Sequence, residues 1–125
     1  MEKYFELGRE AARLAPDFVT EMSAEVSLLY RNAWDEGYRV GYPPQEGLLP
    51  DFLRSWLEHG HFAYLAFDNS SLAGVALLAV EKLCPQLITI KSLDLLIHPE
   101  YQQRDFAQNL FLMIEEKCRE LEIFK

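Results

Sequence analysis

The sequence is poor in cysteine and in long apolar runs, and each shortage excludes a class of protein. Cys84 and Cys118 are the only cysteines in 125 residues, too few for a disulfide scaffold, and neither has a metal-binding spacing, so two free thiols in a reducing cytoplasm are expected. No apolar run approaches the roughly 18–20 residues that span a bilayer. Residues 1–16 carry charges where a secretion signal needs an apolar segment. The protein is expected to be soluble and cytoplasmic, without a membrane partner.

Basic residues are also scarce. Lysine and arginine number 12 against 20 aspartates and glutamates, which gives a formal charge of −8. This charge excludes nucleic acid as a natural partner and suits a cationic, amine-bearing substrate, although solubility alone also explains it. Half of the residues are apolar, and the length fits a single domain over residues 1–125.

Residues 87–121 organise the chain as a strand, a turn and a helix. In the strand the apolar residues change from even to odd positions after Lys91 and Ser92, which predicts a β-bulge there. The helix is expected to begin at Asp105, because Asp105 and Gln108 imitate a capping box. Its apolar stripe comprises Phe106, Leu110, Ile114, Cys118 and Leu121. The turn at residues 98–104 leads into a helix N-terminus, whose free N–H groups favour an anion.

Residues 95–107, LLIHPEYQQRDFA, resemble motif A of the GNAT superfamily of acyl-CoA-dependent N-acyltransferases. In that family a strand ends in a hydrophobic-x-Pro-Glu-Tyr turn, and the following (Gln/Arg)-x-x-Gly-x-(Gly/Ala) holds the pyrophosphate of coenzyme A through backbone amides. Gln102 matches the first position of this motif and Ala107 the last. Asp105 stands where the family prefers glycine, and a carboxylate there repels phosphate.

The resemblance implies that acetyl-coenzyme A binds along this strand and turn as cosubstrate. The implied binding residues are Leu95, Leu96, Ile97, Gln102, Gln103, Arg104, Asp105, Phe106 and Ala107. By the same resemblance, the backbone N–H of Ile97 or a neighbour polarises the thioester carbonyl. Arg104 is expected to offset Asp105 by meeting a phosphate. Asp94 is the candidate base for an ammonium substrate, and a solvent-facing polar residue is the alternative interpretation.

The rest of the chain is expected to add two helices and a hairpin. Residues 1–15 favour a helix by composition and a strand by resemblance. One helix is predicted over residues 23–36, with Ser23 as its N-cap, and a second one runs from Pro50 to just before Gly60. Residues 61–68 and 72–80 form a hairpin. The loop at 37–49 either lines a substrate cleft or covers the core with Tyr38, Tyr42 and Glu46.

This order is similar to the first part of the GNAT plan, and the resemblance implies an α/β fold, a GNAT-like mixed sheet flanked by helices and truncated at its C-terminal end. The implied function is acyl transfer from acetyl-CoA to a small-molecule or protein amine; the alternative is a non-catalytic GNAT-like module for binding or protein association. Residues 121–124 are expected to form a strand whose uncovered edge pairs with a second copy in a homodimer; the alternative is that residues 121–125 extend the helix or fray and leave a monomer. No metal site is expected, because His59 and His61 lack further ligands.

Overall fold

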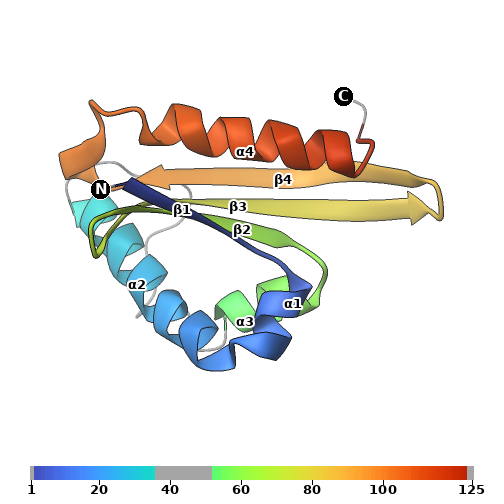
Figure 1. Cartoon of the computed structure of the whole chain (residues 1–125), viewed down its shortest axis with the longest axis horizontal. Helices are drawn as coiled ribbons and strands as arrows, with labels where there is room; N and C mark the ends of the chain where they lie inside the picture. Colours follow the sequence, from blue (N-terminus) through green and yellow to red (C-terminus); the bar gives the residue numbers. More distant parts are fainter. Residues whose placement is uncertain (1, 36–51, 124–125) are drawn as a thin grey trace.

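The computed structural model describes residues 2–35 and 52–123. Four strands form an antiparallel sheet in the order β1-β2-β3-β4, namely β1 (Glu2–Leu7), β2 (Phe62–Asp68), β3 (Ser71–Cys84) and β4 (Leu87–Ile97). Helices α1 (Arg9–Leu14), α2 (Pro16–Asp35) and α3 (Phe52–Glu58) lie on one face, and α4 (Phe106–Glu120) covers the other (Figure 1). The α/β class with helices on both faces is confirmed, and the described sheet is antiparallel rather than mixed. None of these helices is long and apolar enough to cross a membrane.

Two cores form because the side chains of a strand point alternately to the two faces of a sheet. The core beneath the first three helices contains Val19, Met22, Val26, Leu29, Leu53, Leu57, Leu65, Val75 and Leu96. The core beneath α4 contains Phe106, Leu110, Ile114 and Cys118, packed against Tyr64, Ala76, Leu78 and Ile97. The apolar stripe predicted for this helix is therefore confirmed.

The sequence of residues 1–15 left open a helix or a strand, and the structure contains both. Strand β1 comes first, and α1 begins directly after Gly8. The next helix begins at Pro16 rather than at residue 23, so the prediction of Ser23 as an N-cap is wrong. Ser23 is buried in the middle of α2, and its hydroxyl oxygen accepts the N–H of Leu53 across 3.1 Å. A residue taken for the cap of its own helix thus satisfies a first-turn amide of α3.

The predicted bulge in β4 is confirmed. Ala79 on β3 faces Ser92, whereas the next residue, Val80, faces Ile90, which leaves Lys91 as the extra residue. Such an insertion bends the strand and turns the side chains that follow it to the opposite faces. The hairpin between β2 and β3 is also confirmed. The predictions for Tyr38, Tyr42 and Glu46 lie outside the described residues.

The prediction of a strand over residues 121–124 is wrong for Leu121–Ile123, where α4 ends in a Schellman motif. The N–H of Ile123 donates to the carbonyl of Cys118 across 2.9 Å, and that of Glu122 to Arg119 across 3.1 Å. Glu122 has a φ of 54°. The apolar residues of this segment close the helix end, as such motifs do, rather than extend the sheet. Homodimerisation was argued from that strand, and it stays a prediction without this support.

Candidate functional site

The outer edge of β4 carries backbone groups that face away from the sheet. His98 donates its N–H to the carbonyl of Ala73 across 2.7 Å, which fixes which residues of the antiparallel pair exchange hydrogen bonds. Because such pairs alternate, the N–H and C=O groups of Leu93, Leu95 and Ile97 point away from β3. No strand within residues 2–35 and 52–123 pairs with this edge. Within the described ranges the edge is therefore a row of polar groups without a strand partner, as an extended ligand requires.

The end of this row is shaped by a side chain. Gln102 donates an N–H of its side-chain amide to the carbonyl oxygen of Ile97 across 2.7 Å. The N–H of Ile97 stays directed outward, whereas the N–H groups of its neighbours Leu96 and His98 face β3. Of the backbone donors considered for polarising a carbonyl, only that of Ile97 is available in this register.

A short 3₁₀ helix, η1 (Pro99–Tyr101), turns the chain from β4 toward α4. The Nδ1 atom of His98 accepts the N–H of Glu100 across 3.2 Å, and the N–H of Tyr101 donates to the carbonyl of His98 across 2.8 Å. The ring of Tyr101 meets that of Phe106 edge to face, with 5.4 Å between the ring centroids. His98 therefore caps the turn, and the turn is packed onto the first residue of the helix.

Free backbone donors gather where α4 begins. The first helical hydrogen bond runs from Asn109 to the carbonyl of Asp105, at 3.0 Å. The N–H groups of the four residues before Asn109, namely Asp105, Phe106, Ala107 and Gln108, have no hydrogen-bond partner among the described residues. The N–H group of Gln103 has none there either. A helix N-terminus with free N–H groups attracts an anion through both its donors and its dipole.

The capping box predicted for Asp105 and Gln108 is wrong. Asp105 has φ −81° and ψ 14°, and its side chain makes no capping hydrogen bond. A capping side chain reaches back to the first turn from an extended backbone, which this ψ does not provide. The same angles show that aspartate stands in place of the family's glycine without left-handed strain. Its carboxylate is exposed beside the free N–H groups.

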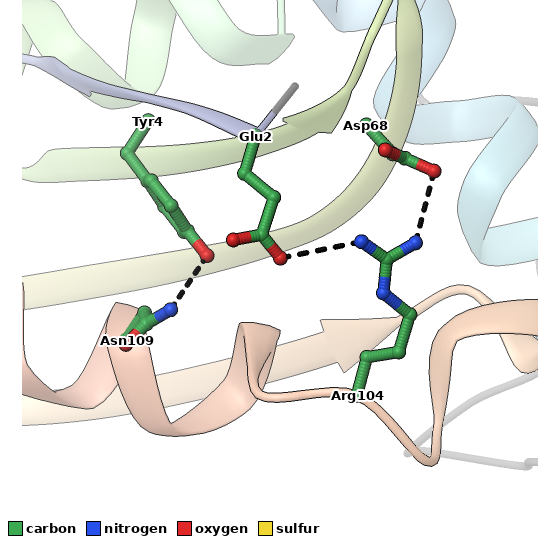
Figure 2. A network of polar contacts seen from close by, with 5 residues as sticks. All are labelled: Glu2, Tyr4, Asp68, Arg104 and Asn109. Carbon is green, nitrogen blue, oxygen red and sulfur yellow. Dashed lines mark hydrogen bonds and ion pairs between the residues drawn. The ribbon is translucent and has the colours of Figure 1, made fainter.

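Arg104 joins three elements at this end of the sheet (Figure 2). Its guanidinium lies 3.0 Å from a carboxylate oxygen of Asp68 and 3.4 Å from one of Glu2, and it lies over the ring of Phe106, 4.8 Å from the centroid. The hydrogen bond to Asp68 raises the pKa of Arg104. Beside it, Tyr4 accepts a hydrogen bond from Asn109 across 2.8 Å. In this arrangement the charge of Arg104 is directed to Glu2 and Asp68, and its contact with a phosphate stays a prediction.

Asp94 lies two residues beyond Ser92, past the bulge, and faces Leu77 of β3. Because side chains alternate, its carboxylate is on the same face of the sheet as Leu96, the face that α2 covers. The residue is exposed, and no described residue forms a hydrogen bond or an ion pair with its side chain. An exposed carboxylate of this kind is compatible with a catalytic base, and equally with a side chain that is only solvated.

A second polar cluster, which the sequence did not indicate, lies beneath the far end of α4. The ammonium of Lys117 is 2.9 Å from Glu6 and 2.8 Å from Glu120, and so fastens α4 to β1. Tyr64 is fully buried nearby; burial, followed by the charge of Glu6, raises its pKa. Its hydroxyl has no hydrogen-bond partner among the described residues. These side chains are separated along α4 from the free N–H groups, so they support the scaffold rather than the site.

The predicted binding residues are brought together in one continuous strip from β4 to α4, but they differ in what they expose. Leu95 and Ile97 present backbone groups, and Gln103, Asp105 and Ala107 present free N–H groups. The side chains of Leu96 and Phe106 are in the cores, and Gln102 and Arg104 hold the turn. No group of three or more His, Cys, Asp or Glu side chains that could hold a metal occurs in the two described ranges.

The sequence itself matches no family model and no curated protein. Solved structures do resemble the chain. A GNAT-family acetyltransferase from Streptococcus pneumoniae aligns with a TM-score of 0.70 and 15% identity, over 100% of this chain and 71% of its own. An aminoglycoside acetyltransferase from an uncultured soil metagenomic sample, in complex with sisomicin, has a TM-score of 0.63 and 14% identity, over 98% and 75%.

A putative acetyltransferase from Salmonella typhimurium, with its cofactor acetyl-CoA, has a TM-score of 0.64 and 12% identity, over 98% of this chain and 65% of its own. These likenesses show that the chain has the fold of the GNAT acetyltransferases, as the resemblance at residues 95–107 implied. Because the identities are this low, they show the fold alone.

Proposed function

We propose that this domain is an acyl-CoA-dependent N-acyltransferase and that acetyl-CoA is its acyl donor. One observation carries the proposal: the outward backbone groups of β4 and the free N–H groups at the start of α4 lie in one continuous strip. The outward N–H and C=O groups of β4 suit the amides of a pantetheine arm, since an extended ligand can pair with a strand edge. The free N–H groups from Gln103 to Gln108 suit a pyrophosphate at a helix N-terminus.

The chemistry requires a free amine, a polarised thioester and a proton for the leaving thiolate. Asp94 takes a proton from an ammonium substrate, directly or through water, and the amine nitrogen then attacks the carbonyl carbon. The N–H of Ile97 stabilises the oxyanion that forms as the C=O bond becomes single. When the C–S bond breaks, the second proton lost by the nitrogen ends on the sulfur, which gives an amide and coenzyme A thiol.

The acceptor in this proposal is a primary amine, on a small molecule or a protein, in the cytoplasm. Two features support a cationic acceptor: the formal charge of −8 and the exposed carboxylate of Asp94. Two free cysteines, Cys84 on the surface and Cys118 buried, are compatible with a reducing compartment. One of the similar structures is an aminoglycoside acetyltransferase bound to sisomicin, so polyamines of this kind are the first acceptors to try.

A non-catalytic module is the second candidate, and specific observations favour it. The carboxylate of Asp105 is exposed beside the free N–H groups, where it opposes a phosphate. Arg104, the cation nearest to it in the loop, is paired with Glu2 and Asp68. A domain of this kind binds coenzyme A weakly or not at all and serves in association with other proteins.

Calorimetric titration with acetyl-CoA, followed by a thiol-release assay with a panel of primary amines, separates the two candidates. Binding together with amine-dependent thiol release supports the transferase. Binding without release for any amine supports the module, and absence of binding contradicts the proposed function. Asp94→Asn is expected to lower kcat/KM and leave acetyl-CoA affinity unchanged, whereas Glu81→Gln, a matched change of an exposed carboxylate on β3, is expected to alter neither.

A further inference from the structure

His61 accepts a backbone hydrogen bond at the point where β3 outruns its neighbour. Strand β2 begins at Phe62, which faces Leu78, so Val80 lies beyond the end of β2. On this side of β3 the N–H of Val80 has no strand to pair with. The Nδ1 atom of His61 accepts it across 3.2 Å and replaces the missing carbonyl. The imidazole therefore completes the sheet at this position.

The residue held by His61 is the one that faces the bulge of β4. On its other side Val80 pairs with Ile90, while Ala79 pairs with Ser92 and Lys91 is left between them. The outward row of Leu93, Leu95 and Ile97 begins immediately after this bulge. A change in the position of Val80 is therefore passed across β3 to the start of that row.

Neighbouring groups fix the ring and its protonation state. The centroid of the Trp56 ring is 4.7 Å from that of His61, and Trp56 Nε1 donates to the carbonyl of Phe62 across 2.9 Å. Accepting an N–H requires that Nδ1 carry no proton, so the ring is neutral with its proton on Nε2. The ring of His59, whose centroid lies 6.4 Å from that of His61, and the ammonium of Lys91 act on His61 electrostatically, and both disfavour a positive charge on it. With burial as the largest cause, they lower the pKa of His61.

We propose that neutral His61 is a positioning residue for the outer edge of β4: it holds Val80, Val80 sets the bulge, and the bulge aligns the backbone row beyond it. Protonation of Nδ1 places two donors opposite each other, the Nδ1–H of His61 and the N–H of Val80, so the hydrogen bond between them breaks in acid. The effect on acyl-CoA affinity rests on the proposed function, whereas the effect on the strand geometry does not.

The expected dependence on pH follows from the sign of the shift. Because the folded pKa lies below the unfolded value, the contribution of His61 to folding is complete above the ordinary histidine pKa of ~6.5. This contribution falls as the pH drops from there to the lowered folded pKa. The geometry of the edge changes only when the folded protein itself takes up the proton, at the lower end of that interval.

Two variants separate the hydrogen bond from the charge. In His61→Asn the Oδ1 atom can accept from Val80 without titrating, whereas His61→Leu removes the acceptor. Amide NMR from about pH 8 to about pH 5, on both sides of the histidine pKa, is expected to show Val80, Ser92 and Leu93 moving with His61 in the wild type. His61→Asn is expected to keep the wild-type shifts at high pH and to lose the titration. His59→Asn is expected to keep the titration with a raised midpoint, because the electrostatic effect by which His59 lowers the pKa of His61 is removed.

Acetyl-CoA affinity gives the second measurement. In the wild type the affinity is expected to fall several-fold as the pH drops over the same interval. The affinity of His61→Asn is expected to stay closer to its high-pH value, and that of His61→Leu is expected to be low at every pH. Any contribution from a phosphate monoester, which titrates near ~6, is common to all variants and cancels in the comparison. Amides of Val80 and Ser92 that ignore the titration of His61, or variants with Asn and Leu that behave alike, would overturn the proposal. If no form binds acetyl-CoA, the proposed function fails, and the amide titration alone decides the role of His61.

Discussion

The side-chain amide of Gln102 donates to the carbonyl oxygen of Ile97 across 2.7 Å and so ties the turn back onto the strand that precedes it. Gln102 matches the first position of the motif that residues 95–107 resemble. In this chain its side chain acts on the protein rather than facing outward. The bond takes the last outward carbonyl of β4 and leaves the N–H of Ile97 as the donor closest to the turn.

Replacing this glutamine is expected to weaken acyl-CoA binding. In Gln102→Leu the loss of one hydrogen bond costs about 0.5–1.5 kcal/mol, and the turn is freed to move away from the strand end. Titration calorimetry with acetyl-CoA is expected to show an affinity reduced about 2- to 10-fold, the range to which that energy corresponds. Gln86→Leu, the same change in the exposed turn between β3 and β4, is the control. Equal affinities in the two variants would contradict this role for Gln102.

Asp105 is expected to limit affinity through its charge. Asp105→Asn removes the charge and keeps the side-chain size, so coenzyme A is expected to bind more tightly, with a gain that shrinks at high salt. Asp105→Gly is expected to tighten binding as well. Because the carboxylate makes no capping bond, its removal costs only the helix-dipole interaction of about 0.3–1 kcal/mol, and glycine adds a backbone entropy cost of about 0.5–1 kcal/mol. Unchanged or weaker binding in both variants would show that the carboxylate does not oppose the ligand.

Gly74 is expected to lose stability when it is given a side chain. A Cβ atom there would lie 2.7 Å from Cδ1 of Ile97, which would have to turn away, and 3.3 Å from the carbonyl oxygen of Leu96, which would have to yield slightly. Gly74→Ala is expected to lower the free energy of unfolding by about 1–3 kcal/mol, as overpacking does, measured by urea denaturation. Gly8→Ala, where the nearest atom is an ordinary 3.5 Å away, is the matched control and is expected to cost less. Similar losses at both sites would argue against a close approach at Gly74.

Glu122 occupies a left-handed position that suits glycine. With φ at 54° in the closing motif of α4, a residue with a Cβ atom is strained by roughly 1 kcal/mol. Glu122→Gly is expected to raise the free energy of unfolding by about 0.5–1 kcal/mol, and Glu122→Val to lower it. Thermal unfolding followed by circular dichroism measures both. A strand in this segment would reverse the order, since strands favour valine over glycine.

Local patterns predicted the elements whose signals are local. The change of parity after Lys91 predicted the bulge, and the spacing from Phe106 to Cys118 predicted the buried face of α4. Residues 121–124 have the apolar content of a strand, but Ile123 is needed to close the helix end, where its N–H meets Cys118. Composition alone does not distinguish these two uses of the same side chains.

Contacts between distant residues were beyond prediction. Ser23 has the residue type of an N-cap, but the first-turn amide that it satisfies lies 30 positions away on another helix. Arg104 was expected to meet a phosphate; its partner Glu2 is 102 positions away, and nothing near Arg104 in the sequence indicates it. His61 accepts from Val80 only because β2 begins at Phe62, opposite Leu78, and leaves the N–H of Val80 without a strand partner. These pairings depend on where the elements meet, which the fold decides.

Amide NMR of the folded chain titrated with desulfo-coenzyme A, an inert analogue that retains the pantetheine amides and phosphates, tests the central claim most directly. Binding at the open edge of β4 and the start of α4 is expected to shift the amides of Leu95, Ile97 and the segment 103–108 together. Lys117 on α4 and Glu6 on β1, which pair at the far end of α4, serve as internal controls, and their amide signals are expected not to shift. Shifts confined to another surface, or no shifts at saturating ligand, would contradict the account.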